Sequence, residues 1–411
     1  MISESLLKIK KIYQKTKLEE QTINKVIQEV ANQLILQKDF ILSENQKDLD
    51  KMSKADPKYD RLLLNESRLK DISNQLNSIA SYPTCVGLIL EKKQTKTNLT
   101  ITKVSCPIGL IGVIYEARPN VTPDVFAICL KSHNACVLKG GSDAENSNNA
   151  IVKIIHEALV KYNLPKEIVY IMPSDRKYID DVIKANGIID LCIPRGGKGL
   201  IEYVRKNATV PVIETGAGVV HMYIDEDFNL EYAKNCIFNS KTRRVSVCNA
   251  LDSVLIHKNA INFLPKILEP LESKNVKLYC DNQAFEELKD IYPFLYQATQ
   301  EDFGREFLDY AMSVKVVKNI EEAIEHIETH SSHHSDCIIS ENKQNIELFQ
   351  ASVDSAVVYI NTPTSFTDGG EFEMGAEIGN STQKLHARGP MSVKEMTSYK
   401  WIVSSKGVLR K

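Results

Sequence analysis

The sequence predicts an α/β protein built around mostly parallel β-sheets. From Leu110 onward, short apolar runs alternate with segments of helical periodicity, so that Leu110–Tyr115 resembles a buried strand and Val121–Lys131 a helix. A second series of the same kind runs from Leu251 to Ile360. Strands that alternate with helices pair in parallel, because each helix returns the chain to the same end of the sheet. Two such series predict two parallel-sheet domains.

The remaining elements of both series follow from the same periodicities. In the first series, strands are expected at Ala135–Lys139, Glu167–Met172, Ile188–Ile193 and Val219–Asp225, with helices over about residues 145–162, 178–185, 200–207 and 230–240. In the second series, strands are expected at Leu251–His257, Val276–Tyr279, Ser313–Val317, Asp336–Ser340 and Ser355–Ile360, with a helix over 320–329 and another before the last strand.

Outside these series the pattern changes twice. Residues 1 to about 82 are helical, because Leu, Ile and Val recur at three- and four-residue intervals among polar residues. The stretch 95–108 is rich in β-formers, and Thr397–Ser405 partly alternates as an edge strand. Such a strand at the chain end would lack a neighbour, and pairing with another subunit would supply one.

Composition narrows the class of function. The chain is 43% hydrophobic and 25% charged with a net charge of −2, which is typical of a globular protein and argues against a general nucleic-acid or membrane-surface binder. Residues 1–8 lack an apolar signal core, and no apolar stretch is long enough to span a bilayer. The nine cysteines show no CxxC spacing, which argues against a disulfide framework. We therefore expect a cytoplasmic protein.

Two glycine turns follow predicted parallel strands. Gly140, Gly141 and Ser142 follow the strand that ends at Lys139, and Arg195, Gly196, Gly197 and Lys198 follow the strand that ends at Ile193. Glycines at a strand-to-helix turn let backbone N–H groups approach phosphate, and the helix N-terminus adds positive potential. A single glycine turn often only reverses the chain, but two of them, each with a lysine, favour a dinucleotide cradle. The spacing is not G-x-G-x-x-G.

Cys248 lies between a basic run and an apolar strand. Lys241, Arg243 and Arg244 precede it, and nearby cations lower the pKa of a thiol and so favour the nucleophilic thiolate. The alternative is a buried structural cysteine, which is the commoner kind. Upstream, Glu214 stands at the end of the expected strand 210–216, where it would act as a general base or bond backbone amides.

Two polar stretches in the last third have less specific patterns. The histidines of residues 330–334 match no zinc spacing, so we expect a polar turn and no metal site. Residues 364–390 hold many glycines, hydroxyls and charges, which is typical of a long ordered loop.

Taken together, these motifs resemble the γ-glutamyl phosphate reductase family within the aldehyde dehydrogenase superfamily. The resemblance extends from the N-terminal helices to the final strand, and its most specific part is the last segment. The motifs are the stretches 113–122, 137–142, 193–201, 211–216, 247–250 and 375–391. The resemblance implies an aldehyde dehydrogenase-like fold with two Rossmann-like domains and an oligomerisation arm.

The implied organisation has four parts. Residues 1–225 would form the cofactor-binding domain, with the β-rich stretch 95–108 in the oligomerisation arm, and residues 226–362 the catalytic cysteine domain. Residues 363–396 would form the substrate loop and return to the cofactor domain, and 397–411 the C-terminal oligomerisation strand. A homodimer or homotetramer is expected.

The resemblance also implies the chemistry. Cys248 would attack the acyl phosphate of L-glutamyl 5-phosphate and expel phosphate, and hydride from NADPH would convert the thioester to L-glutamate 5-semialdehyde, the second step of proline biosynthesis. Asn120 would hold the oxyanion together with the backbone N–H of Cys248, although asparagine also suits a helix N-cap. Glu214 matches the base that hydrolytic members use, and in a phosphate reductase it would only orient groups.

Binding residues are implied one by one. For the cofactor, the resemblance points to Lys139, Gly140, Gly141, Ser142, Arg195, Gly196, Gly197, Lys198 and Glu306, of which Glu306 would hold the nicotinamide ribose. For the substrate it points to Arg118, Ser381, Thr382, Lys384 and Arg388. Ser365 stands where the family usually has arginine, which binds carboxylate or phosphate bidentately, as serine cannot. Arg118, Lys384 or Arg388 would have to compensate. Milder departures are Val245, Asp252 and Val219–Val220.

The implied acyl phosphate must come from a separate glutamate 5-kinase, which we expect to be a transient partner. Two alternatives stay open. One is a hydrolytic aldehyde dehydrogenase, and the other is a non-catalytic binding protein.

Overall fold

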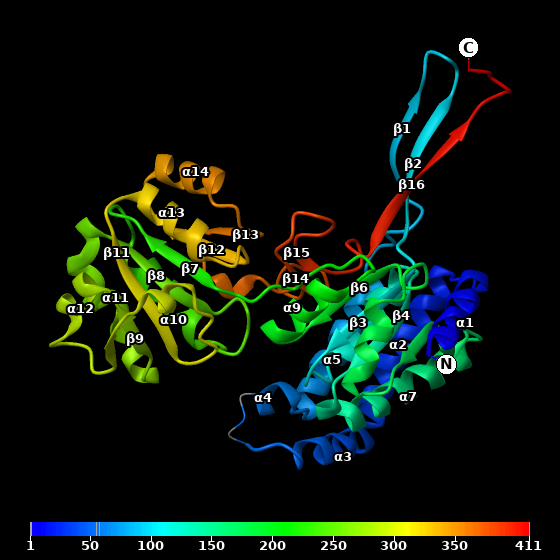
Figure 1. Cartoon of the computed structure of the whole chain (residues 1–411), viewed down its shortest axis with the longest axis horizontal. Helices are drawn as coiled ribbons and strands as arrows, with labels where there is room; N and C mark the ends of the chain where they lie inside the picture. The colour runs from blue at the N-terminus through cyan, green and yellow to red at the C-terminus, as the bar shows by residue number, and fades with distance from the viewer. Residues whose placement is uncertain (1, 55, 57, 411) are drawn as a thin grey trace. The chain divides into compact units, whose positions relative to one another are not determined.

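The computed structural model describes residues 2–54, 56 and 58–410, and Met1, Ala55, Pro57 and Lys411, which fall within predicted ranges, lie outside it. The chain forms two compact units (Figure 1). The first runs up to Thr215 and is completed by Phe372–Gly379 and the segment from Leu385 on, and the second comprises Gly216–Glu371 and Asn380–Lys384. The sequence analysis places the first boundary after residue 225 instead.

The first unit is organised around a four-stranded parallel sheet with the strand order β5-β4-β3-β6. The strands are β3 (Leu110–Tyr115), β4 (Ala135–Gly140), β5 (Val169–Ile171) and β6 (Leu191–Arg195). Every residue of β3 and β4 is buried, which fits strands that are apolar throughout and covered on both faces. Because the pairing is parallel, the carboxyl ends of the four strands meet at one edge.

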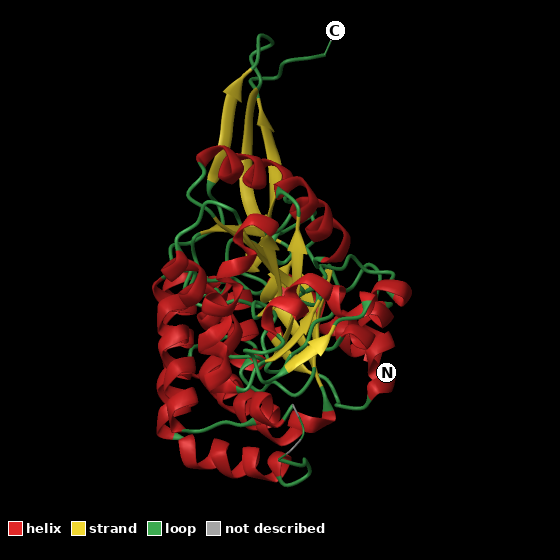
Figure 2. Cartoon of the chain, turned by 90° about the vertical axis from the view of Figure 1, so that its left-hand side faces the viewer, coloured by secondary structure: helices red, strands yellow, loops and turns green. Residues whose placement is uncertain are grey.

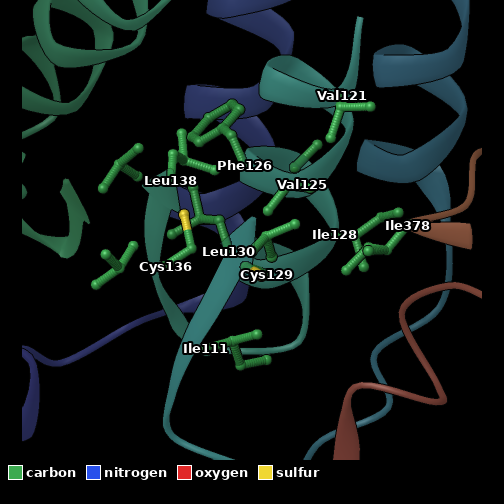
Figure 3. Close-up of a cluster of buried hydrophobic side chains, with 14 of the residues drawn as sticks. Ile111, Val121, Val125, Phe126, Ile128, Cys129, Leu130, Cys136, Leu138 and Ile378 are labelled. Carbon is green, nitrogen blue, oxygen red and sulfur yellow. The ribbon is translucent and has the colours of Figure 1, made fainter. Parts of the chain in front are cut away.

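A helix follows each of these strands, and one of the helices lies wholly in the core. They are α6 (Val121–Lys131), α7 (Glu145–Lys161), α8 (Ile179–Ile183) and α9 (Lys198–Asn207). All residues of α6 are buried, and Figure 3 shows Phe126 and Ile128 in a cluster with Leu138 of β4 and Ile378 from the returning C-terminal segment. The C-terminal segment thus contributes to a core that also holds N-terminal helix residues such as Leu6 and Ile23.

Five N-terminal helices form the predicted helical layer. They are α1 (Ile2–Lys15), α2 (Glu20–Leu36), α3 (Lys38–Leu49), α4 (Tyr59–Leu62) and α5 (Glu66–Ser81). Two buried charges tie the layer to the sheet domain. The ammonium of Lys131 donates to Glu20 (3.2 Å) and Asn24 (2.7 Å), and the carboxylate of Asp48 accepts from the backbone N–H of Ser147 (2.8 Å) in the first turn of α7. Each charge is buried with the partners that it needs.

A three-stranded antiparallel sheet forms an arm. Its strands are β1 (Ile89–Gln94), β2 (Thr100–Pro107) and β16 (Thr397–Ser404), in the order β1-β2-β16, and they extend away from the helices of the first unit (Figures 1 and 2). The expectation that the C-terminal strand lacks a neighbour within its own chain is wrong. This strand, β16, pairs with β2 from Thr397 opposite Pro107 to Ser404 opposite Thr100. Within the described residues its other edge remains unpaired.

The second unit holds a seven-stranded parallel sheet with the order β10-β9-β11-β8-β7-β12-β13. The strands are β7 (Val220–Ile224), β8 (Leu251–His257), β9 (Lys277–Cys280), β10 (Leu295–Gln297), β11 (Ala311–Val317), β12 (Ser335–Ile339) and β13 (Val357–Ile360). The helices are α10 (Leu230–Thr242), α11 (Leu264–Leu268), α12 (Asn282–Leu288), α13 (Ile320–His330) and α14 (Lys343–Ser352).

Successive side chains of the central strands pack on opposite faces of this sheet. On β8, Ile256 packs in the cluster with Ile237 of α10, and Leu255 packs in the cluster with Ile327 of α13. The predicted α/β class with two parallel sheets and a separate arm is confirmed. Of the helices in the part of the chain that is described, none is long and apolar enough to cross a membrane.

The expected strand over residues 210–216 is wrong. Only Val212 makes an isolated bridge, to Cys192, and the rest of the segment has irregular backbone. The long loop near the C-terminus contains two short strands, β14 (Gly379–Ser381) and β15 (Gly389–Met391).

Candidate active site

The strand ends of the first unit surround a cavity of about 440 Å³. Lys139, Gly141 and Ser142 line it, together with Glu116 from the turn after β3 and Arg176 from the 3₁₀ turn Arg176–Tyr178. Ligands of open parallel sheets bind outside the carboxyl ends of the strands, which is where this cavity lies. The first predicted glycine turn therefore lies at the edge of the sheet where parallel sheets bind their ligands.

Lys139 is fixed beside this cavity. It is buried, and its ammonium donates to the carbonyl oxygens of Gly140 (2.9 Å) and Ser174 (2.8 Å). Burial lowers the pKa of Lys139 because it disfavours the charged ammonium. A phosphate bound beside it would have the opposite effect and favour the charged form. A substituent on Gly140 would meet the side-chain amide of Asn148 at 2.5 Å, which explains a glycine at this position.

The second glycine turn holds a carboxylate that the sequence analysis does not identify. The Glu116 carboxylate accepts a hydrogen bond from the backbone N–H of Gly197 (3.1 Å), directly before α9, and lies 3.8 Å from the Arg176 guanidinium. A side chain on Gly196 would come within 2.7 Å of Glu116. Arg195 packs instead against Gly379, and Lys198 is exposed as the first residue of α9. The signal for Glu116 was an acidic residue directly after a buried strand.

The other predicted residues of the first unit lie on loops. Asn120 occupies the N-cap position of α6, as the alternative expects, but its side chain makes no capping hydrogen bond. Its amide donates instead to Asp124, at 3.5 Å. Arg118 lies two residues earlier, Glu214 lies in the irregular segment before Thr215, and Arg388 directly precedes β15.

In the second unit, Cys248 lies on the loop between α10 and β8 and is half-buried. Gly218 packs so closely on this loop that a β-carbon there would stand 1.7 Å from the carbonyl oxygen of Cys248. Seven of the other cysteines are buried, and burial raises the pKa of the Cys192 thiol to about 12 and that of Cys236 to about 11. Buried thiols are thus held protonated. Cys248 and Cys106, on β2 of the arm, are the two half-exposed thiols.

The expected role of Lys241 as a cation beside this thiol is not what the structure shows. Lys241 is fully buried, its ammonium donates to the carbonyl of Leu251 (2.7 Å), and it lies 3.8 Å from the Asp252 carboxylate. Burial lowers the pKa of Lys241 and raises that of Asp252 to about 7. Asp252 also accepts from the backbone N–H of Phe307 (3.0 Å). The pair therefore supports the segment that carries Glu306.

Glu306 is close to the nucleophile loop through Gly218. Its carboxylate accepts from the backbone N–H of Gly218 at 3.0 Å, and Gly218 is the residue that packs on Cys248. Gly218 thus contacts both the predicted nucleophile, Cys248, and the predicted ribose-binding carboxylate, Glu306.

The predicted substrate residues divide between the units. Ser381, Thr382 and Lys384 belong to the second unit, whereas Arg118 and Arg388 belong to the first. The Thr382 side chain lies against Gly216, where a β-carbon would come within 3.0 Å of it. Lys384 forms an ion pair with Asp354 (2.7 Å), so its charge already has a partner.

The histidine-rich region packs into the second unit. His326 and His330 of α13 lie with ring centroids 4.4 Å apart, and burial lowers the pKa of His326 to about 2. Its ring is therefore neutral. Among the residues that the structure describes, no three His, Cys, Asp or Glu side chains gather as ligands for a metal ion.

Comparisons with known proteins show the family of the chain. The model of the aldehyde dehydrogenase family matches residues 8–289. A protein of Bacteroides thetaiotaomicron named gamma-glutamyl phosphate reductase is 51% identical over 395 residues, which cover 96% of this chain and 95% of that protein. A protein of the same name from Chlorobium chlorochromatii is 51% identical over 395 residues, which cover 96% of this chain and 94% of that protein.

Solved structures extend the comparison. The crystal structure of gamma-glutamyl phosphate reductase from Thermotoga maritima is 38% identical, superposes with a TM-score of 0.92 and covers 100% of this chain and 99% of that chain. An acetylating aldehyde dehydrogenase from Geobacillus thermoglucosidasius shares the fold, with 18% identity and a TM-score of 0.71 over 100% of this chain and 97% of that chain.

Proposed function

The chain belongs to the γ-glutamyl phosphate reductases of the aldehyde dehydrogenase family, and on that premise we propose that it reduces L-glutamyl 5-phosphate to L-glutamate 5-semialdehyde with NADPH. It is an oxidoreductase of a family that uses a nicotinamide cofactor. The observation that carries the proposal is the position of Cys248, a half-exposed thiol on a loop that packs on Gly218, which in turn binds Glu306.

The reaction follows from a thiolate at Cys248. Its sulfur attacks the acyl carbon of the substrate, a C–S bond forms, and the bond between that carbon and the phosphate oxygen breaks, so that phosphate leaves and a thioester remains. When bound, a nicotinamide cofactor would supply a hydride, and addition of this hydride to the thioester carbonyl would leave the alkoxide of a thiohemiacetal on Cys248. This alkoxide would re-form the C=O bond as the C–S bond breaks, which releases the aldehyde and regenerates the thiolate.

Two residues of the first unit are proposed to assist. The side-chain amide of Asn120 is free of a capping role and donates only a long hydrogen bond to Asp124, so it suits a donor to the oxyanion that develops on the acyl carbon. Glu214 is proposed to orient groups and not to activate water, because water attack on the thioester would waste the substrate.

We assign preference for NADPH over NADH to the cavity of the first unit. Lys139 and Ser142 line it, and the Arg176 guanidinium adds a second cation at its wall. A 2′-phosphate attracts such groups, and arginine binds phosphate bidentately. The second glycine turn, with Gly196, Gly197 and Lys198, would then lie under the pyrophosphate.

The arm is proposed to bind a second subunit, which makes the protein a homodimer or homotetramer. β16 ends the arm sheet with an unpaired edge among the described residues and exposes Tyr399, Trp401, Ile402 and Val403. An edge strand with large exposed apolar side chains is a template for pairing with another chain.

The source of the substrate and the location of the enzyme follow from chemistry. Acyl phosphates hydrolyse readily, so we propose transient association with the glutamate 5-kinase that makes this one, which predicts higher coupled flux when the two are mixed than when they are separated by dialysis membrane. A cytoplasmic location suits the nine cysteines, none of which forms a disulfide in the structure.

The reverse reaction tests the function. Absorbance of NADPH is followed while the protein oxidises glutamate semialdehyde with NADP⁺, in phosphate buffer and in phosphate-free buffer. We expect activity that requires phosphate and is lost in Cys248→Ala, while Cys106→Ala, which removes the other half-exposed thiol, stays active. Activity that is indifferent to phosphate would instead indicate a hydrolytic dehydrogenase with Glu214 as its base.

A further inference from the structure

The loop that carries Cys248 also carries a cation without an acidic partner. Arg243 is the C-cap residue of α10 and is exposed. Its guanidinium donates one hydrogen bond, to the carbonyl oxygen of Ser365 at 3.4 Å, and no carboxylate in the described part of the chain forms an ion pair with it. A guanidinium has five N–H donors in a fixed plane, and this hydrogen bond uses one of them.

The segment that receives this hydrogen bond is held firmly. The Ser365 hydroxyl donates to the side-chain oxygen of Asn239 (2.6 Å) on α10, and the Asn249 amide donates to the carbonyls of Ser365 (3.3 Å) and Thr367 (3.0 Å). Asn249 directly follows Cys248 in the chain. Asn249 therefore links the Cys248 loop to the segment 365–367, to which Arg243 also donates its hydrogen bond.

The position of Arg243 also bears on the departure at Ser365. The family resemblance implies an arginine at position 365, for which Arg118, Lys384 or Arg388 would have to compensate. Of these, Lys384 already pairs with Asp354. A different guanidinium, that of Arg243, reaches the carbonyl of residue 365 itself. A guanidinium is thus present beside residue 365, although it belongs to Arg243.

We propose that Arg243 binds the α-carboxylate of the glutamyl substrate and so selects for it, an inference that rests on the proposed function. In the acyl phosphate, the phosphate is bonded to the carbon that Cys248 attacks, and it leaves in the first step. The α-carboxylate lies at the other end of the carbon chain and stays on the substrate through thioester and aldehyde. Arg243 precedes Cys248 by five residues and is held by the Ser365 carbonyl, so its guanidinium suits the group that stays on the substrate.

Comparing two aldehyde substrates distinguishes loss of carboxylate binding from a general loss of activity. Glutamate semialdehyde and 4-aminobutanal differ only in the carboxylate. We expect Arg243→Gln to lower kcat/KM for glutamate semialdehyde by about 10- to 100-fold, the loss typical of a charge-assisted hydrogen bond, and to leave kcat/KM for 4-aminobutanal and KM for phosphate unchanged. Arg243→Lys keeps the charge but not the planar fork and should lose less. Lys266→Gln, which removes an exposed charge from α11, is the matched control and should change neither substrate.

Two results would overturn the assignment while the wild type remains active. One is an equal loss for both aldehydes in Arg243→Gln, which indicates a structural role. The other is a raised KM for phosphate with unchanged selectivity between the aldehydes, which places the phosphate at Arg243. A wild-type protein without phosphate-dependent activity on glutamate semialdehyde would overturn the proposed function itself, whatever Arg243 does.

Discussion

Replacing Lys241 by methionine tests whether the buried Lys241–Asp252 pair is charged. Burial raises the pKa of Asp252 to about 7, so the folded state holds a proton that the unfolded chain releases, and this group lowers stability as pH rises from about 4 towards 7. Lys241, 3.8 Å away, favours the ionised carboxylate. Without it the pKa of Asp252 rises further, and the loss of stability continues above pH 7.

The size of the effect follows from the pKa. At pH 7 about half of Asp252 is ionised, and losing the ionised form costs about 0.4 kcal/mol, whereas at pH 8 the same loss costs about 1.4 kcal/mol. The lost hydrogen bond to Leu251 adds about 1 kcal/mol at either pH. The difference in free energy of unfolding between wild type and Lys241→Met should therefore widen by about 1 kcal/mol from pH 7 to pH 8.

Urea unfolding followed by circular dichroism at both pH values measures this difference. Lys266→Met, at an exposed position on α11, serves as the control and should show the same small effect at both pH values. If Lys241→Met destabilises the protein equally at pH 7 and pH 8, Asp252 is not the group that titrates and the reasoning fails.

Three further predictions concern activity and assembly. Gly218→Ala places a β-carbon 1.7 Å from the Cys248 carbonyl, so steady-state kinetics should show a loss in kcat of about 100-fold, and near-normal turnover would mean that the loop tolerates displacement. Arg176→Ala should raise KM for NADPH by about 10-fold and leave KM for NADH unchanged, whereas equal changes for both cofactors would remove Arg176 from the 2′-phosphate site. Trp401→Glu puts a charge on the exposed arm, and light scattering should report a lower molar mass than for the wild type; an unchanged mass would place the subunit contact elsewhere.

The sequence predicts elements whose signals are local. Helix α6 begins and ends at the predicted residues, and β3 and β8 also match their predicted bounds. The strand expected over 210–216 fails, because its apolar residues pack as irregular backbone against β6 and make one bridge only. Local composition does not distinguish these two outcomes, since both bury the same side chains.

The site is predicted less completely, because its electrostatics depend on neighbours that are distant in sequence. Glu116 meets Gly197 only because β3 and β6 are adjacent in the sheet. Lys241 looks like a cation for Cys248 in the linear sequence, but it lies four residues after Ile237 and so shares the buried face of α10. The helical periodicity that we used for α10 contained this signal.

The strand pairing of the arm has a consequence for synthesis of the chain on the ribosome. β2 pairs with β16, which is made roughly 290 residues later, so at a translation rate of about 5–20 residues per second the edge of β2 stays open for roughly 15–60 s. The second unit can fold during this interval, since it lies between the two strands in sequence. A chain that stops before residue 397 lacks β16, so this edge of β2 stays unpaired and accessible to chaperones and proteases.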